Sequence, residues 1–396
     1  MPLSAAGAFL FILLFIMNID EARNLFPYIK NGTIYFNHAA LGPLSSKVVE
    51  KINYYLDERS RSNIMNYESF VEIEKKAKGK LSRLLGSAET RIAWTDNVSN
   101  ALNLLAQSVY WKAGDRIILN NIEFPANVYP FLNLRKQGVE IDFAQAKNGI
   151  VTADDIESLI SPRTKLISVS LVQFLSGYRI DINRLGDICR SNGIIFCVDA
   201  IQAAGAVNIN VQDSKIDFLA GGAQKWLMAL QGLSYLYISE TLQESIDPKY
   251  VGWLSVEDAW NFLDYNLTLK KTAERFQNGT QNALGIVALN ESLDLFENFG
   301  YVNIENNIME NSGYFIDSLQ NIGIKTFLSS EDKKHLSGIV SIKVIDPQAF
   351  FDKIMENKIN CALREGIIRF SPHFYNTRGE IDSAIDTIKS ITKSLK

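Results

Sequence analysis

The chain of 396 residues is too long for one small hydrophobic core, which predicts two domains, or one large and one small domain. Hydrophobic residues make up 47% and charged residues 21%, as in a folded globular protein, and the formal net charge of −4 gives no reason to expect nucleic acid as a partner. The three cysteines (Cys189, Cys197 and Cys361) are odd in number and show no CxxC spacing. This argues against disulfides or a metal site and is typical of a reducing, cytoplasmic compartment.

The first 17 residues differ from the rest of the chain. Residues 5–17 form an uncharged apolar run, shorter than the roughly 20 residues that a membrane-spanning helix needs. No Lys or Arg precedes this run and no small-residue cleavage site clearly follows it, so a signal peptide is the weaker interpretation. We expect that residues 1–17 are an extension with a misassigned start, that translation begins at Met17, and that the protein does not associate with a membrane.

Between about residues 70 and 240, short β-rich runs alternate with helical ones. Seven runs are typical of strands: residues 91–95, 116–120, 139–143, 165–170, 194–199, 218–221 and 234–238. Helical patterns between them cover residues 100–110, 127–137, 153–159 and 182–192. This alternation predicts an α/β fold, with a mostly parallel seven-stranded sheet covered by helices on both faces.

The pattern changes after about residue 285. Helices are predicted at residues 286–299, 304–319, 349–357 and 380–394, and strands at 323–327, 338–344 and 367–370. This is a smaller α+β unit, and no low-complexity linker precedes it. We therefore expect a large domain over residues 46–284 and a small C-terminal domain over residues 285–396. Residues 18–45 are expected to form an N-terminal segment that packs on the small domain and the active-site cleft.

Two successive predicted strands end in residues that indicate chemistry. One ends in Asp199, at the edge of the sheet where open α/β folds bind ligands, and the next leads through Gly-Gly-Ala into Lys225. A partly desolvated lysine loses its proton more easily, which imine formation requires, and an acid beside a pyridine nitrogen keeps that nitrogen protonated. Each signal is weak alone, because such an Asp is more often structural and such a Lys usually lies at the surface.

A third segment indicates an anion site. Residues 96–100 (DNVSN) join a strand to a helix, and their Asn and Ser side chains are typical N-caps. The free N–H groups and the dipole of a helix N-terminus attract phosphate. An ordinary capped helix is the alternative interpretation. However, this segment, the strand-end acid and the lysine occur together in one chain, and three separate structural explanations are less simple than one shared site.

Eight segments, in order and spacing, match one known family. They are YFNHAALGP at 35–43, TDNVSNALN at 95–103, EFPAN at 123–127, VQFLSGYRID at 172–181, VDAIQAAGA at 198–206, GGAQKW at 221–226, RFQNGTQN at 275–282 and REGIIRFSPHFYNT at 364–377. From about residue 34 to 394 the chain resembles the class V aminotransferase family, the fold-type-I pyridoxal-phosphate enzymes that include cysteine desulfurases, selenocysteine lyases and isopenicillin-epimerase-like proteins.

The resemblance implies pyridoxal 5′-phosphate as cofactor and assigns residues to its ring. Lys225 resembles the catalytic Schiff-base lysine, and Asp199 matches the acid that pairs with the pyridinium nitrogen. Gln202 matches the side chain near the ring hydroxyl, and Gln173 lies near the same oxygen. Phe124 occupies the position that stacks over the ring, where many relatives have a histidine that can also move a proton.

The resemblance also implies a phosphate site that is shared between two subunits. The phosphate is expected to contact Ser99 and the backbone of Asn97 and Val98. The loop that resembles the segment reaching the neighbouring subunit's phosphate consists of Asn278, Gly279 and Thr280. This implies a homodimer with shared active sites.

On the substrate side, the resemblance aligns Arg369 with the arginine that pairs with the α-carboxylate, a task suited to the planar guanidinium. Arg364 is expected either to assist or to form a salt bridge with a local acid. His38, in the Gly-Pro turn that lines the substrate side in relatives, is a candidate substrate contact. The alternative is a hydrogen-bonded turn histidine.

Two departures from the family limit the functional prediction. Gln224 precedes the lysine where many relatives have His, and it offers a neutral hydrogen bond only. Cys361 lies eight residues before Arg369 without the Gly/His-rich loop of a desulfurase nucleophile, so we expect it to be structural.

The resemblance therefore implies a pyridoxal-phosphate enzyme acting on a small amino acid through Schiff-base and quinonoid intermediates, most simply a class V aminotransferase-type transferase. A cysteine desulfurase or C–S lyase is the enzymatic alternative. A catalytically silent protein of the same fold is disfavoured, because Lys225, Asp199 and Arg369 are all retained. A nucleotide- or NAD-binding protein is disfavoured too, because the chain has neither a GxGxxG nor a GxxxxGK[ST] loop.

Overall fold

The computed structural model describes residues 17–395, so the predicted N-terminal extension, apart from Met17, lies outside the described residues. Within this part of the chain, no helix combines the length and the apolar character needed to cross a membrane. The backbone N–H of Met17 donates to the carbonyl of Asn298 at 3.0 Å. The chain as described therefore starts on the surface of the folded body.

A seven-stranded sheet forms the centre of the large part of the molecule. Its strands are β2 (Ile92–Thr95), β3 (Arg116–Asn120), β4 (Glu140–Ala144), β5 (Thr164–Ser170), β6 (Ile195–Asp199), β7 (Phe218–Gly222) and β8 (Ser234–Ile238). Their order is β2-β8-β7-β6-β5-β3-β4, and only β8 runs antiparallel to its neighbours. The structure confirms all seven predicted strands. They could be predicted because continuous apolar runs are typical of strands buried on both faces.

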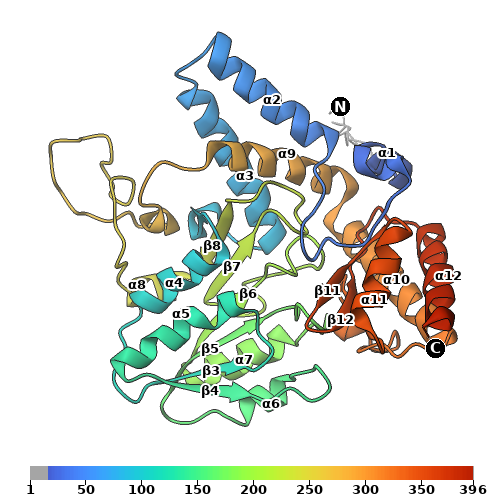
Figure 1. Cartoon of the computed structure of the whole chain (residues 1–396). Helices are drawn as coiled ribbons and strands as arrows, with labels where there is room; N and C mark the ends of the chain where they lie inside the picture. Colours follow the sequence, from blue (N-terminus) through green and yellow to red (C-terminus); the bar gives the residue numbers. More distant parts are fainter. Residues whose placement is uncertain (1–16, 396) are drawn as a thin grey trace, which may run out of the picture.

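Helices cover both faces of this sheet (Figure 1), and an apolar cluster lies on each face. One lies under α4 (Val98–Ser108), α5 (Tyr129–Leu132) and α8 (Glu240–Ser245). The other lies under α3 (Tyr67–Leu85), α6 (Ala153–Glu157), α7 (Ile182–Asn192) and α9 (Ala283–Phe299), with α2 (Ser46–Arg61) packed on α9. The helix predicted at residues 127–137 is split into short 3₁₀ and α turns, and α5 carries Pro130, which lacks the N–H that a continuous helix needs.

The C-terminal residues form a smaller unit with its own apolar cluster. Its helices are α10 (Tyr301–Asn321), α11 (Pro347–Glu356) and α12 (Arg378–Ser394). They cover one face of an antiparallel sheet, β11 (Ala362–Arg364), β12 (Ile367–Phe370) and β9 (Val340–Lys343), in that order (Figure 1). The predicted strand at residues 323–327 is wrong. Within it only Thr326 forms a bridge, to Ile342, and the Thr326 hydroxyl donates to the carbonyl of Leu328 at 2.6 Å.

The N-terminal segment joins the smaller unit. After α1 (Ile19–Asn24), strand β1 (Ile34–Tyr35) pairs in parallel with β10 (Ile359–Asn360). The segment then crosses to the large part, where the N–H of Gly42 donates to the carbonyl of Gln224 at 2.8 Å. A Cβ atom on Gly42 would lie 2.2 Å from the carbonyl oxygen of Lys225, so only glycine permits this close approach.

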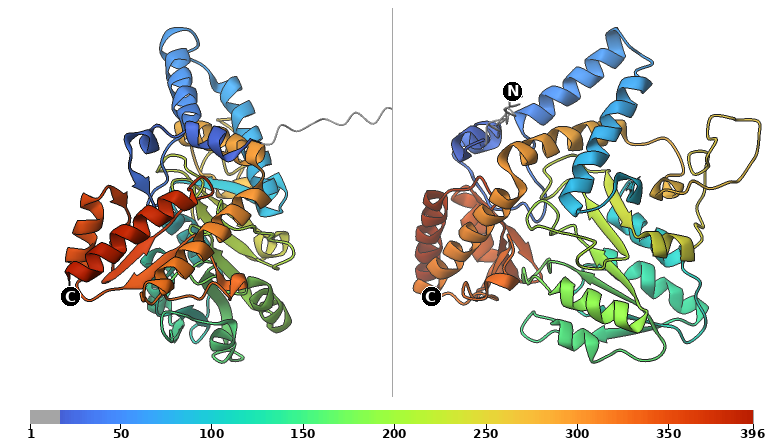
Figure 2. Two further views of the ribbon diagram at one scale, coloured as in Figure 1. Left: turned by 90° about the vertical axis from the view of Figure 1, so that its right-hand side faces the viewer. Right: turned by 180° about the vertical axis from the view of Figure 1, so that it is seen from behind.

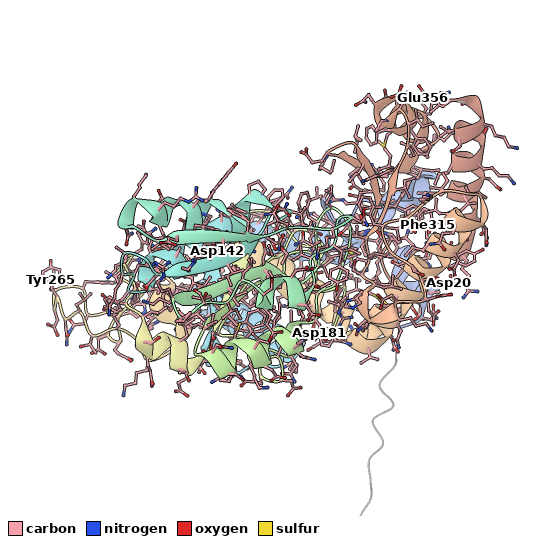
Figure 3. All side chains as sticks on the ribbon, turned by 90° about the horizontal axis from the view of Figure 1, so that it is seen from below. Asp20, Asp142, Asp181, Tyr265, Phe315 and Glu356 are labelled. Atoms are coloured by element: carbon pink, nitrogen blue, oxygen red, sulfur yellow. The ribbon has the colours of Figure 1, made fainter. Side chains whose placement is uncertain are left out.

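A long loop between α8 and α9 projects away from the body (Figures 1 and 2). In Figure 3, Tyr265 in this loop lies at one end of the molecule, and Glu356 of the smaller unit lies at the other. Large apolar side chains of the loop are exposed, namely Trp260, Phe262, Leu263, Tyr265 and Leu267. Such a concentration of exposed apolar residues is typical of a surface that another protein covers.

Candidate active site

Asp199 lies at the carboxyl end of β6, in the middle of the large sheet. Its Cα pairs with Ser170 on β5 and with Ala220 on β7, and only 2% of the residue is exposed. The backbone N–H of Ile201 donates to its carboxylate at 2.9 Å. Burial, together with the nearby Glu123 carboxylate, raises the pKa of Asp199 to about 7, although the Ile201 N–H and Lys225 act in the opposite direction. A partly protonated carboxyl group therefore lies at the sheet edge where α/β folds bind ligands.

Lys225 lies in the loop that follows β7 on the same edge. Its Nζ atom is 5.7 Å from the centre of the Phe124 ring. Burial, together with Arg369 and Arg364, lowers the pKa of Lys225 to about 8, although the Asp199 carboxylate acts in the opposite direction. Part of the amine population is therefore neutral near physiological pH, which is the form that attacks a carbonyl.

Phe124 supplies an exposed aromatic face above the lysine. The side chain is 47% exposed, and its ring meets Phe174 edge-on at a centroid distance of 5.4 Å. The contact fixes the ring plane while leaving one face open. The structure thus brings together Phe124, Lys225 and Asp199, three residues that the sequence places in different segments.

Glu123 is a buried site residue to which sequence analysis assigned no role. Its carboxylate accepts hydrogen bonds from Asn120 Nδ2 at 2.6 Å, from the Ser170 N–H at 2.8 Å, from the Ser170 hydroxyl, and from Gln173 Nε2 at 3.0 Å. Burial raises the pKa of Glu123, while the bonds from Ser170 and Asn120 lower it. The sequence signal was a carboxylate within an otherwise apolar and amide-rich turn just after a predicted strand.

Gln173 is held by this carboxylate in one orientation. Its Nε2 points to Glu123, and its buried Oε1 has no hydrogen-bond partner among residues 17–395. Buried polar atoms without a partner are rare and need an explanation. A ligand with a hydrogen-bond donor would satisfy this oxygen.

The first turn of α4 has the features of an anion site. The Asn97 side chain caps the helix by accepting the N–H of Asn100 at 2.8 Å, and Ser99 is half-buried in the first turn. The first N–H groups of a helix, including those of Val98 and Ser99, have no partner within the helix. Residues of the 278–280 loop, with Asp96 and Asn100, line a nearby cavity of about 740 Å³.

Arg369 provides a buried cation on the smaller unit. It lies on β12 and is 2% exposed. One Nη atom donates to the carbonyl of Phe174 at 2.7 Å, while Nε has no hydrogen-bond partner among the described residues. Burial, together with the nearby Arg364, lowers the pKa of Arg369 to about 10. A buried guanidinium without a carboxylate is costly, so an anionic ligand is its natural partner.

Gln202 and Gln224 lie beside the lysine loop. The Gln202 side chain accepts from Trp226 Nε1 at 2.9 Å and donates to the carbonyl of Ala39 at 3.0 Å, and it is 3% exposed. It therefore ties the N-terminal segment to the lysine loop. The Gln224 side chain is half-buried, and its backbone carbonyl accepts the Gly42 N–H.

His38 does not lie where a substrate could reach it, so its expected substrate contact is corrected. The residue is fully buried. Its Nδ1 is 2.9 Å from the carbonyl of Ser371, and its Nε2 is 2.8 Å from the hydroxyl of Tyr375. Both ring nitrogens thus have protein partners, and the residue acts as a hydrogen-bonded turn histidine.

His373 lies beside His38 under the lysine loop. The two rings are 4.9 Å apart, and His373 Nε2 is 3.0 Å from the carbonyl of Trp226, the residue after the lysine. Burial lowers the pKa of His373 to about 4, and burial together with His373 lowers the pKa of His38. Both rings are therefore neutral in the folded protein at physiological pH.

We expect these histidines to destabilise the protein in mild acid. A pKa lowered by folding means that the unfolded chain binds protons first, so stability is complete above about pH 6.5 and falls as the pH drops towards 4. For His373 alone, the loss by pH 4 is on the order of 3 kcal/mol. The free energy of unfolding in urea, measured from pH 7.5 to 4.5, should fall less steeply in His373→Gln than in the parent. Equal slopes in His373→Gln and the parent would contradict the prediction.

The cysteines are all free and buried. Cys361 is 2% exposed inside the apolar cluster of the smaller unit, and burial raises its pKa to about 12. A nucleophilic cysteine needs a lowered pKa and access to its substrate. The surroundings of Cys361 have the opposite effect, as expected for a structural cysteine.

Known proteins share this fold over nearly the whole chain. The apo structure of cysteine desulfurase from Thermococcus onnurineus NA1 superposes with a TM-score of 0.86 at 25% identity, covering 96% of this chain and 99% of that one. The uncharacterized aminotransferase YcbU of Bacillus subtilis (strain 168) is 26% identical over 373 residues, 94% of this chain and 98% of that protein. A probable cysteine desulfurase of Pyrococcus abyssi (strain GE5 / Orsay) is 28% identical over 402 residues, 95% and 98% of the two chains.

The fold and these likenesses define the architecture of fold-type-I pyridoxal-phosphate enzymes, and the predicted α/β fold is confirmed. The aminotransferase class-V family matches residues 34–383, and the chain belongs to that family. The expectation of a pyridoxal-phosphate-dependent enzyme of the aminotransferase or lyase type is confirmed at this level.

Proposed function

We propose that this enzyme binds pyridoxal 5′-phosphate through Lys225 and acts on a small amino acid. The observation that carries the proposal is the pair formed by Lys225 and Asp199, an amine with a lowered pKa and a carboxyl with a raised pKa at one sheet edge. Strongly shifted pKa values in opposite directions are typical of acid–base sites. The unpaired Oε1 of Gln173 and the open face of Phe124 fit an aromatic ligand that carries hydrogen-bonding groups.

Each residue has a definite task in this proposal. Asp199 holds a proton at the pyridine nitrogen, Phe124 stacks on the ring, and Ser99 binds the phosphate at the first turn of α4. The other residues proposed to contact the cofactor are Asn97, Val98, Gln173, Gln202 and Gln224. When bound, the cofactor withdraws electrons from the Cα atom of an attached amino acid. Arg369 fixes the α-carboxylate, and Lys225 Nζ takes a proton from Cα or returns it.

We further propose a homodimer in which loop residues Asn278, Gly279 and Thr280 reach the phosphate of the neighbouring subunit. The exposed apolar side chains of the preceding loop support this proposal, because a second copy would cover them. The three free, buried cysteines support a reducing compartment such as the cytoplasm.

The test of the proposal is the visible spectrum of the purified protein, before and after borohydride. We expect an absorption band from the lysine-linked cofactor, its loss after borohydride, and a changed band on addition of a substrate amino acid. Mass spectrometry of the reduced protein should place the added mass on Lys225. A protein that stays colourless with added pyridoxal phosphate would overturn the proposal.

C–S bond cleavage by elimination is a second candidate function. Elimination needs a base at Cα but no thiol on the enzyme, so it is compatible with the buried state of Cys361. A desulfurase that passes sulfur to its own cysteine needs an accessible thiolate, which none of the three cysteines offers.

We expect Cys361→Ala to retain the activity of the parent within about twofold, because the thiol only packs in the small cluster. The cavity should cost roughly 1 kcal/mol of stability. Turnover of each accepted amino acid and sulfide release from cysteine are the measurements. Selective loss of sulfide release, with other reactions intact, would show that Cys361 is a nucleophile after all.

The pH dependence of cofactor loading gives a further prediction. Only the neutral amine of Lys225 reacts, and its pKa of about 8 means that the loading rate of the apoprotein rises up to pH 8 and then levels off. Between pH 7 and 9 the rise should be about tenfold, against about hundredfold for an ordinary lysine. Stopped-flow absorbance measures this rate. Asp199→Asn should move the plateau to lower pH, since the carboxylate raises the lysine pKa, and a rate that keeps climbing beyond pH 9 would contradict the prediction.

A further inference from the structure

Cationic side chains gather on one face of the small sheet. On β12, Arg369 lies opposite Ser341 of β9, and two residues earlier Ile367 lies between Arg364 of β11 and Lys343 of β9. Residues opposite each other on neighbouring strands share a face, as do residues two apart on one strand. Arg364, Lys343 and Arg369 therefore project from the same face.

This face looks toward the active site. The alternate residues Val340, Ile342, Ile368 and Phe370 are buried in the cluster under the helices, which fixes the cationic face on the other side. There the Ser341 hydroxyl donates to the carbonyl of Leu175 at 2.6 Å, and Arg369 donates to that of Phe174. Both carbonyls belong to the segment that follows Gln173. The guanidinium of Arg364 also lowers the pKa of both Lys225 and Arg369.

Neither Arg364 nor Lys343 forms an ion pair within residues 17–395. Arg364 donates only to the carbonyl of its own neighbour, Leu363, at 2.9 Å, and Lys343 Nζ lies 5.1 Å from the centre of the Phe327 ring. The salt bridge with a local acid that sequence analysis left open for Arg364 is therefore not formed. The adjacent acid, Glu365, occupies the exposed tight turn between β11 and β12 with φ at 49°.

We propose that the substrate is an amino acid with an acidic side chain, and that Arg364 binds this second anionic group while Arg369 binds the α-carboxylate. The inference rests on the proposed function and narrows its substrate class. One α-carboxylate needs one guanidinium, so a second, unpaired guanidinium on the same face is available for another anion. Lys343 adds positive potential behind Arg364 without direct contact, and its effect is screened by salt.

The first test compares acids with their neutral isosteres. Aspartate against asparagine, and glutamate against glutamine, differ only in the charge and donors of the side-chain end. We expect kcat/KM to favour one of the acids by about tenfold or more, and Arg364→Gln to remove that preference by losing about tenfold more kcat/KM with the acid than with the amide. Lys343→Gln should give a smaller loss that disappears at high salt. Lys389→Gln on the exposed side of α12 removes the same charge elsewhere and should have no effect.

The second test needs no turnover. Glutarate and its monoamide are titrated into the purified protein by calorimetry, with and without pyridoxal phosphate. We expect glutarate to bind about tenfold more tightly, and Arg364→Gln to abolish the difference. Equal binding of the two compounds, equal use of acids and amides, or an equal loss for both in Arg364→Gln would overturn the inference. If the proposed function were wrong, the visible absorption band would be missing, whereas the difference in binding between glutarate and its monoamide would remain.

Discussion

Lys225→Ala is expected to lose the visible absorption band and to turn over amino acids roughly 10²–10⁴-fold more slowly than the parent, from loss of the base at Cα alone. The amine of Lys225 is partly neutral because burial outweighs the attraction of Asp199, and no other lysine is proposed to take its place at this edge of the sheet. The covalent hold on the cofactor should disappear as well, so the cofactor should be lost on gel filtration.

Further measurements on Lys225→Ala distinguish a loss of chemistry from a loss of folding. Removing the ammonium should raise the pKa of Asp199 above its value of about 7, because Lys225 lowers it in the parent. Thermal unfolding and circular dichroism of Lys225→Ala should resemble those of the parent. Added methylamine should restore part of the activity if the lost group is the proton carrier. If Lys225→Ala kept full activity and an unchanged absorption band, the reactive lysine would be a residue other than Lys225.

Arg369→Gln is expected to raise KM about 100-fold or more with a smaller change in kcat. Breaking one partner of a buried charge pair costs roughly 2–5 kcal/mol, and the α-carboxylate of the substrate would be left without its cation. Glutamine keeps a donor for the carbonyl of Phe174, which limits the damage to the fold. Steady-state kinetics over a wide substrate range separates the two parameters.

Arg369→Lys is the control for this prediction. Lysine keeps the charge but loses the planar two-pronged geometry, so an intermediate KM is expected. The pKa of Lys225 should rise in Arg369→Gln, because the guanidinium lowers it in the parent, and the plateau of cofactor loading should move to higher pH. An unchanged KM in both variants would mean that another residue binds the carboxylate.

The sequence predicted the central sheet well because its strands are buried on both faces. Strands such as β3 and β8 show as uninterrupted apolar or aromatic runs with turn residues on either side, and the structure places them at the predicted residues. The family resemblance supplied what periodicity alone could not, namely that Asp199 and Lys225 belong to one site. Burial shifts the pKa of each of them in the direction that the proposed role requires.

Other features depend on contacts that a single sequence does not show. Glu123 looks like an ordinary turn residue until the fold brings Ser170 and Gln173 to it. His38 lies in a family motif near the site, yet the fold encloses it between Ser371 and Tyr375. The segment 323–327 has an alternating pattern, but it contacts the neighbouring strand β9 only through one bridge and one backbone hydrogen bond, at Thr326 and Phe327.

The contacts that hold the lysine loop also have a consequence for how the protein is made. Gly42, early in the chain, and His373, late in the chain, both form hydrogen bonds to the backbone of the lysine loop. The hydrogen bond between His38 and Tyr375 joins residues 337 positions apart. During synthesis His38 is made long before Tyr375. Their contact therefore forms only after both residues are available. The large sheet can assemble on the nascent chain, but the contacts of His373 with the lysine loop and of Tyr375 with His38 form only after residues 373–375 have left the ribosome.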